Sequence, residues 1–225
     1  MAKTLTQCSI ILTTTVTISE YIQCIKQRDP TERLNTYLKA INNWIALTNF
    51  KIILVENSGY SFPELEHLKE SNKDRFEIIS FDQNELEDAC HLIKEKAKGV
   101  CEVFSINYAI KHSKILQDTN FIIKVTGRYY IPELQNYLEK YDLNLYDCLT
   151  QHDRDRCEMV GSHVKNTDFI FNVNLVDKNG NYDNHIENVW KYRTSCFDNN
   201  LHCKIFTIER TQRGCGNKYV CFENI

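Results

Sequence analysis

Phe50-Lys-Ile-Ile-Leu-Val-Glu-Asn-Ser-Gly59 is an apolar run that passes directly into a polar turn, and it decides the expected fold. The pattern recurs at Asn120-Phe-Ile-Ile-Lys-Val-Thr-Gly-Arg-Tyr-Tyr130. Short continuous apolar runs bounded by turn residues are typical of strands that are buried on both faces, as in parallel sheets. The two stretches therefore predict parallel strands whose ends carry polar side chains.

Helix patterns separate the apolar runs in the first half of the chain. Asp29-Pro30-Thr31-Glu32 combines an acidic cap with Pro at the first helical position, so it predicts the start of a helix. The other elements expected here are strands at 8–16 and 76–81, a short helix that opens at 61–64, a helix at 86–99 after a capping box at 82–85, and a helix at 101–116. Strands separated by helices imply right-handed crossovers. We therefore expect an α/β fold with a mostly parallel central sheet and helices on both faces.

The second half of the chain has a weaker pattern. We expect strands at 145–150, 159–163 and 204–208, a short apolar run at 169–171 and an amphipathic helix at 184–192. No internal repeat or linker is visible. Residues 1–225 are therefore expected to form a single domain.

Composition narrows the classes of protein. The chain has 225 residues, 42% of them hydrophobic, and a formal charge of −3, so no chain-wide basic field marks a nucleic-acid binder. No apolar run reaches the roughly 20 residues of a membrane helix, and the N-terminal run lacks a signal-peptide pattern. Ten cysteines without a CxxC pair favour reduced thiols over zinc or disulfides. We expect a cytoplasmic protein without a transmembrane segment.

The polar strand ends suggest a ligand site. Thr13-Thr14-Thr15, Glu56-Asn57-Ser58, Asp82 and Thr126-Gly127-Arg128 all follow predicted strands. Ligands of open α/β sheets bind beyond the carboxyl ends of the strands. The chain has no glycine-rich dinucleotide fingerprint and no P-loop, so any nucleotide must be held in another way.

The order of these segments, with Lys98-Gly99, Glu102 and Asn107 before the strand at 120–126, resembles the nucleotide-binding half of GT-A-fold (Rossmann-like) glycosyltransferases. Residues 121–130 are similar to a K-x-T-G-R-Y segment in glycosyltransferase-like proteins of bacterial polysaccharide clusters and large DNA viruses. The resemblance covers roughly residues 7–135, which it implies bind a nucleotide sugar, and it leaves 136–225 for an acceptor. If the source is viral, the location would be the host cytoplasm.

The resemblance implies a set of donor-binding residues. These are Thr13, Thr14, Glu56, Asn57 and Ser58 for base and ribose, with Asn107, Lys124, Thr126, Gly127 and Arg128 towards the diphosphate. Enzymes of this fold usually carry Asp-x-Asp where this chain has Thr126-Gly127-Arg128. A fixed cation can neutralise a leaving diphosphate in place of a metal, so Lys124 and Arg128 are the candidates. The alternative is a surface Lys and a salt-bridged Arg.

An Asp-x-Asp does occur elsewhere, at Asp153-Arg154-Asp155, next to His152. Asp153 and Asp155 could bind Mg²⁺ or Mn²⁺. The alternative is a solvated loop whose alternating charges pair with one another. No metal or other cofactor is required by the sequence.

Inverting sugar transfer needs a base for the acceptor hydroxyl. By its place in similar proteins the first candidate is Glu187, followed by His152 and Asp153; retaining transfer would need none of them. The sequence therefore favours a transferase that moves a sugar from a nucleotide-sugar donor to a glycan or a small acceptor. Two alternatives remain open, a sugar nucleotidyltransferase and a non-catalytic sugar- or nucleotide-binding module of the same fold.

Overall fold

The computed structural model describes residues 7–20, 22, 25–95, 98–214 and 220–225. Its strands are β1 (Cys8–Thr14), β2 (Lys51–Glu56), β3 (Phe76–Ser80), β4 (Phe121–Thr126), β5 (Cys148–Thr150), β6 (Met159–His163), β7 (Asn200–His202), β8 (Thr207–Gln212) and β9 (Cys221–Asn224). Its α-helices are α2 (Pro30–Leu47), α3 (Glu66–Ser71), α4 (Glu87–Glu95), α5 (Lys98–His112), α6 (Leu134–Leu138), α7 (Thr167–Ile170) and α8 (Ile186–Ser195).

The main sheet is mostly parallel. In the described part of the chain its seven strands follow the order β3-β2-β1-β4-β6-β5-β7, while β8 and β9 form a separate pair. β1 pairs in parallel with β2 and β4, and only β6 runs antiparallel to its neighbours β4 and β5 within this sheet of the described residues. The expected α/β class with a mostly parallel central sheet is confirmed.

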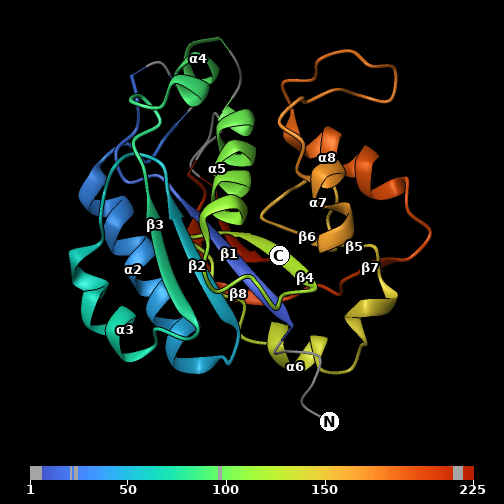
Figure 1. Ribbon diagram of the computed structural model, residues 1–225, viewed down its shortest axis with the longest axis horizontal. Coiled ribbons are helices and arrows are strands. Elements are labelled where there is room, and N and C mark those ends of the chain that lie inside the picture. Colours follow the sequence, from blue (N-terminus) through green and yellow to red (C-terminus); the bar gives the residue numbers. More distant parts are fainter. Residues whose placement is uncertain (1–6, 21, 23–24, 96–97, 215–219) are drawn as a thin grey trace.

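Helices cover both faces of the sheet (Figure 1). All seven residues of β1 are buried, and their side chains alternate between two apolar clusters. Ile10 and Leu12 join the cluster that contains α2 and α6, whereas Ile11 joins the cluster that contains α5, α7 and α8. Burial on both faces explains why β1 reads as a continuous apolar run.

α2 begins as its sequence predicts. Asp29 is the N-cap, its side chain accepts a hydrogen bond from the Glu32 amide at 2.9 Å, and Pro30 opens the helix. The helix buries Tyr37, Ile41 and Trp44 against the sheet. The capping residue and the apolar stripe both indicate the same helix, so the start of α2 was predictable from the sequence.

Two helix predictions between 82 and 99 were wrong. Asp82 does not cap a helix, since it forms a bridge with Ser58 and accepts the Asn84 amide at 2.8 Å, and α4 begins only at Glu87. Gly99 does not end a helix either, because it is the second residue of α5. A Cβ at Gly99 would lie 2.8 Å from Cβ of Ile186, so the glycine allows α5 and α8 to approach closely.

The second half differs more from the prediction. The expected strand at 145–150 is reduced to β5, because Asp142 accepts the Asn144 amide at 3.1 Å and turns residues 143–145 into a 3-10 helix. The apolar run at 169–171 belongs largely to α7. The expected strand at 204–208 begins at 207 as β8, because Phe206 instead packs into the α2-side cluster. β7 and β9 were not predicted.

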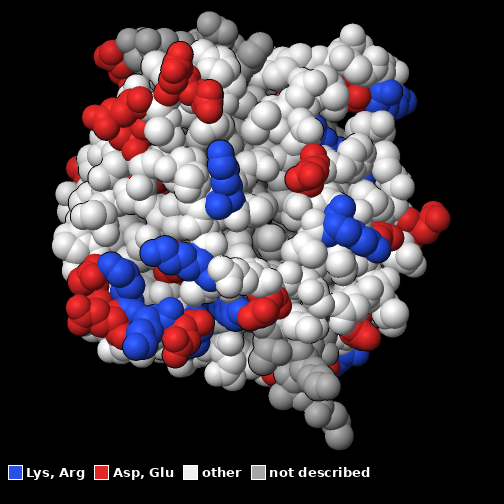
Figure 2. Space-filling view, in the orientation of Figure 1, with Lys and Arg blue, Asp and Glu red and all other residues white. Residues whose placement is uncertain are grey.

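Charged side chains are distributed unevenly on the face shown in Figure 2. Figure 2 shows acidic side chains over α4 and both charge signs mixed over α3 on this face of the molecule. None of the helices among the described residues is long and apolar enough to cross a bilayer. Cys8, Cys148 and Cys203 are buried free thiols, as expected of small apolar side chains, whereas Cys24 and Cys215 lie outside the described residues.

Candidate functional site

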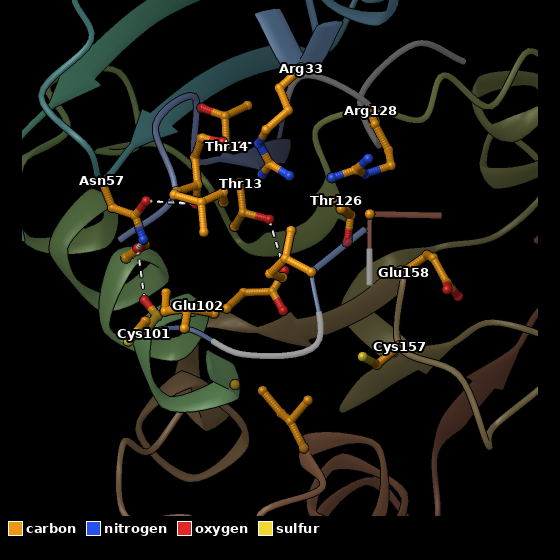
Figure 3. Close-up of a pocket in the computed structure, with 18 of the residues that line it drawn as sticks. Thr13, Thr14, Arg33, Asn57, Cys101, Glu102, Thr126, Arg128, Cys157 and Glu158 are labelled. Carbon is orange, nitrogen blue, oxygen red and sulfur yellow. Dashed lines mark hydrogen bonds between the residues drawn. The ribbon is translucent and has the colours of Figure 1, made fainter. Parts of the chain in front are cut away.

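A cavity of about 170 Å³ lies beyond the carboxyl ends of β1, β2 and β4 (Figure 3). It brings together six residues that the sequence predicted for the site, namely Thr13, Thr14, Asn57, Thr126, Arg128 and Glu187. α2, α5 and the segment before β6 contribute further polar side chains, including Arg33, Tyr37, Glu102, Ser105, Cys157 and Glu158. The position is the one at which open α/β sheets bind ligands.

Three arginines line the cavity, Arg33, Arg128 and Arg213, and the first two contact Tyr37. Arg128 donates from Nη1 to Oε1 of Gln27 at 2.8 Å and from Nη2 to the Tyr37 hydroxyl at 3.4 Å. Arg33 donates from Nη2 to the same hydroxyl at 2.6 Å and from Nε to the Thr15 carbonyl, also at 2.6 Å. Both guanidinium groups lie within cation–π distance of the Tyr37 ring. The hydrogen bonds fix the two cations in place.

Arg128 is 7% exposed, and no carboxylate of the described residues lies within ion-pair distance of it. The alternative of a salt-bridged Arg is therefore wrong for the residues that the structure describes. A nearly buried cation without a counter-charge is costly unless an anion binds beside it. This end of the cavity is suited to an anionic group.

Lys124 does not line the cavity. Its ammonium is fully buried and lies 2.7 Å from Oε1 of Glu102, and it also donates to Oγ1 of Thr126 at 3.1 Å and to the Cys157 carbonyl at 2.7 Å. Burial tends to lower the pKa of Lys124, but attraction to Glu102, Cys157 and Glu158 outweighs it and raises the pKa above its usual value. The surface-Lys alternative is wrong, and the charge that Lys124 supplies is already met by a carboxylate.

Two carboxylates reach the cavity from different elements. Glu187 projects from the first turn of α8, and among the described residues it makes no hydrogen bond or ion pair. Glu158 is engaged, since Arg156 Nε lies 3.1 Å and Gln151 Nε2 lies 3.0 Å from its Oε2. Glu187 is therefore the more available of the two for a proton transfer.

The turn after β2 is stabilised by its own hydrogen bonds, and of its three predicted site residues only Asn57 lines the cavity. The Glu56 carboxylate is buried and accepts the amides of Val16 at 2.9 Å and of Tyr60 at 2.8 Å, together with the amide and hydroxyl of Ser58. Burial raises the pKa of Glu56, and these hydrogen bonds oppose the rise. Glu56 and Ser58, both predicted to bind the donor, do not line the cavity, because they bond to each other and to the β1 turn.

Asn57 is the residue of this turn that lines the cavity. Its Oδ1 accepts the Thr15 hydroxyl at 2.7 Å, and its Nδ2 donates to Gln83 at 3.1 Å and to Ser105 at 3.2 Å. The amide is thereby locked between the β1 turn and α5.

Gly127 and Asn107 also lie away from the cavity. The Gly127 amide donates to the Thr13 carbonyl at 2.9 Å, and a Cβ at this position would meet Cγ2 of Thr14 at 2.5 Å. Asn107 donates to the carbonyls of Val103, at 2.9 Å, and of Phe171, and so ties α5 to α7. Gly127 allows the end of β4 to approach β1, and Asn107 holds α5 and α7 together.

His152, Asp153 and Asp155 line a different cavity, of about 560 Å³, together with His202 and Lys191. Asp155 pairs with Lys191 at 2.5 Å, and Asp153 accepts the amide of Asp155 at 3.0 Å. In the described part of the chain no group of three His, Cys, Asp or Glu side chains could hold a metal ion. The structure thus separates these three residues from Arg128 and Glu187.

Sequence reasoning missed Arg33 and gave Glu102 no role. Arg33 lies one turn before Tyr37 on the buried stripe of α2, and a charged residue inside an apolar stripe was the available signal. Lys124 in the middle of an apolar strand was the corresponding signal for a buried acidic partner, but its identity as Glu102 depends on how α5 packs on β4.

Comparisons with known proteins bear on the fold. No protein-family model and no curated protein matches the chain. Among solved structures, the glycosyltransferase GlyE of Streptococcus pneumoniae TIGR4 superposes with a TM-score of 0.51 at 6% identity, over 87% of this chain and 45% of that one. This chain therefore spans less than half the length of the pneumococcal protein.

Two weaker likenesses are a putative nucleotide-diphospho-sugar transferase from Desulfovibrio desulfuricans G20 and residues 1–349 of S. aureus TarS. The first has a TM-score of 0.47 and 13% identity over 88% of this chain and 79% of that one. The second has a TM-score of 0.44 and 12% identity over 88% and 58% of the two chains. The sheet order and the pneumococcal match show that this chain shares the α/β fold of that glycosyltransferase.

Proposed function

We propose that the chain binds a nucleotide sugar in the cavity at the carboxyl ends of β1, β2 and β4 and transfers the sugar to a glycan or a small acceptor. One observation carries this proposal, the nearly buried Arg128 without a carboxylate partner among the described residues. A donor diphosphate would supply the missing negative charge, and bidentate phosphate contacts are what a guanidinium favours.

The residues around Arg128 then take defined roles in the proposal. Arg33 and Arg128 hold the diphosphate, while Thr13, Thr14, Asn57 and Thr126 line the strand ends beside it. Lys124 acts through Glu102 and does not contact phosphate. A cavity of about 170 Å³ is smaller than the roughly 300–1,000 Å³ of typical small-molecule pockets, so it would enclose the diphosphate and an adjoining ring.

Glu187 is the proposed base for transfer with inversion. Its carboxylate would take the proton of the acceptor hydroxyl while the hydroxyl oxygen attacks the anomeric carbon. The bond from that carbon to the diphosphate breaks, and the departing negative charge is stabilised by Arg128 and Arg33.

In this proposal Arg128 and Arg33 take the place of the metal that this fold often uses. Thr126-Gly127-Arg128 occupies the position of the usual Asp-x-Asp and offers no carboxylate there. Asp153 and Asp155 remain a proposed Mg²⁺ or Mn²⁺ site in the other cavity, where Lys191 competes with a cation for Asp155. No step of the proposed transfer depends on that site.

The test is thermal unfolding with UDP-, GDP-, dTDP- and CMP-linked sugars, each with Mn²⁺ and with EDTA. A donor at about a hundred times its dissociation constant should raise the midpoint by about 5–10 °C. Arg128→Gln should reduce that shift strongly, whereas Arg210→Gln, which removes an exposed pair with Glu223 between β8 and β9, should leave it unchanged.

Each result has one reading. A shift that survives EDTA supports binding by Arg128 without metal, and a shift that needs Mn²⁺ and is lost in the Asp153→Asn/Asp155→Asn variant favours the second cavity. Donor binding without turnover favours the non-catalytic module. Formation of nucleotide sugar from a nucleoside triphosphate and a sugar phosphate favours the nucleotidyltransferase. No shift with any donor overturns the proposal.

A further inference from the structure

Glu102 stands out among the polar residues of the cavity because one of its two carboxylate oxygens is fully engaged and the other is not. Oε1 lies 2.7 Å from the Lys124 ammonium and accepts the Thr13 hydroxyl at 2.9 Å. Oε2 accepts no hydrogen bond from any residue that the structure describes. The side chain of Glu102 is 24% exposed and lines the cavity, so Oε2 is accessible from it.

Glu102 is the ion-pair partner of a buried cation. Lys124 has no exposed side-chain surface, and among the described residues its ammonium forms an ion pair with Glu102 alone, between β4 and α5. In this ion pair Glu102 is the carboxylate partner, and a carboxylate only accepts hydrogen bonds.

The two sides of the cavity differ in charge. Figure 3 shows Arg33 and Arg128 on one side and Glu102 on the other, with Thr13 and Thr126 between them. A ligand that satisfies both sides carries negative charge at one end and hydrogen-bond donors at the other. A carboxylate repels phosphate, so Glu102 cannot share the diphosphate with the arginines.

We infer that Glu102 is a specificity-determining residue whose Oε2 accepts a hydrogen bond from a ring hydroxyl of the bound donor. The inference rests on the proposed function, since it assigns the sugar-recognising residue of the same site. The ring is either the ribose of the nucleotide or the transferred sugar, because both present hydroxyl donors next to the diphosphate.

The consequence is discrimination against donors that lack that hydroxyl. Removing it, or replacing the carboxylate, loses a hydrogen bond to a charged group, which corresponds to about a 10- to 100-fold loss of affinity. Binding of inorganic diphosphate, which has no ring, should not need Glu102.

The experiment compares three proteins by calorimetric titration. Glu102→Gln alone leaves Lys124 buried without its partner and can fail to fold, so the decisive variant is E102Q/K124M, which removes both charges together. The matched control is E66Q/K69M, which removes an exposed pair on α3 with the same two substitutions. The probes are inorganic diphosphate, UDP, dUDP and UDP-glucose, with GDP, dGDP and GDP-mannose in parallel.

The inference predicts that E102Q/K124M binds inorganic diphosphate within about threefold of the wild type and loses about 10- to 100-fold in affinity for a ring-bearing probe. Loss for UDP or GDP but not for its 2′-deoxy counterpart identifies the ribose. Loss only for the nucleotide sugar identifies the transferred sugar. E66Q/K69M should match the wild type throughout.

Two results would overturn the inference while leaving the proposed function in place. One is a folded E102Q/K124M variant that binds every nucleotide and nucleotide sugar as the wild type does. The other is an equal loss for diphosphate and for ring-bearing probes, which would mean that the pair only maintains the shape of the cavity. A wild-type protein that binds none of the nucleotide probes overturns the proposed function, and the assignment of Glu102 with it.

Discussion

Gly127 shows how one absent side chain maintains the site. An added Cβ would lie 2.5 Å from Cγ2 of Thr14 and 2.9 Å from the Thr13 carbonyl oxygen, and the second contact is with backbone that cannot rotate away. β4 and β1 therefore meet at the cavity only because residue 127 is glycine. Its contribution is steric fit between two strands.

We expect Gly127→Ala to lower the free energy of unfolding by about 1–3 kcal/mol, the usual cost of forcing atoms into a packed region. Urea unfolding measures the change. Thr14→Ser removes the nearer of the two contacts, so G127A/T14S should recover part of the loss. An alanine variant as stable as the wild type would contradict the close packing of these strands.

Glu187→Gln separates binding from chemistry in the proposed transfer. The amide keeps the size of the side chain but cannot take a proton, so turnover should fall by about 100- to 10,000-fold. Donor affinity should stay within about threefold, because no described residue depends on Glu187 for a hydrogen bond. Steady-state rates with the donor found in the thermal panel measure this, with exposed Glu66→Gln as the control. Unchanged turnover would exclude Glu187 as the base and favour transfer with retention.

Individual residues also show what the sequence could and could not predict. Strand-end position was sufficient to gather Thr13, Thr14, Asn57 and Arg128, because parallel strands end at the same edge of the sheet. Side-chain direction was not predictable for Glu56, which accepts the amides of Ser58 and Tyr60 in its own turn and the amide of Val16 after β1. The partner of Lys124 depends on packing between α5 and β4, which no local pattern encodes.

At the level of elements, the long ones were predictable and the short ones were not. β1, β2, β4 and α2 have enough residues to show a clear apolar pattern. β7 has three residues, too few for a period of two to appear, and it is held at the sheet edge by its pairing with β5. Tertiary contact forms such strands more than their own composition does.

The edge strand β7 carries a pH-dependent contribution to stability. Its His202 lies 3.1 Å from the Thr150 hydroxyl on β5. Partial burial lowers the pKa of His202, and the nearby charges of His152 and Arg154 lower it further. The folded state therefore binds this proton less readily than the unfolded chain, whose His titrates near 6.5.

Because the pKa of His202 is lower in the folded state than in the unfolded chain, acid destabilises the fold. The contribution of His202 is complete above about pH 6.5 and is lost as the pH falls through the lower folded pKa. We expect the free energy of unfolding to fall on acidification from about pH 8 to about pH 5, and less steeply in His202→Asn. Urea unfolding of the wild type and of His202→Asn at both pH values measures how much the free energy of unfolding of each protein falls. The difference between the two proteins at about pH 8 is the reference for their difference at about pH 5. Equal slopes would contradict the prediction.

At the scale of the whole molecule, the two halves of the chain share one sheet. β4 from the first half pairs with β6 from the second, and Phe206 and Ile208 near the C-terminus pack into the same apolar cluster as α2. Neither half can lose its structure without exposing the other's apolar surface. The proposed nucleotide-sugar and acceptor halves are therefore expected to be one unit of stability.

We expect a single cooperative transition in urea, with tryptophan fluorescence and far-ultraviolet circular dichroism giving the same midpoint. The fluorescence reports on both faces of the sheet, since Trp44 lies on α2 and Trp190 on α8. Two separated transitions would show that 7–135 and 136–225 unfold independently, and the single-domain prediction would then be wrong.

The central position of β1 also matters for how the chain is made. β1 needs β4 on one side, and β4 ends about 110 residues later in the sequence. At roughly 5–20 residues per second, a ribosome takes on the order of ten seconds to synthesise that interval. During this time the nascent chain carries an apolar strand with one edge and parts of both faces uncovered. Early chaperone contact at residues 8–14 would protect the growing chain from aggregation until β4 has left the ribosome.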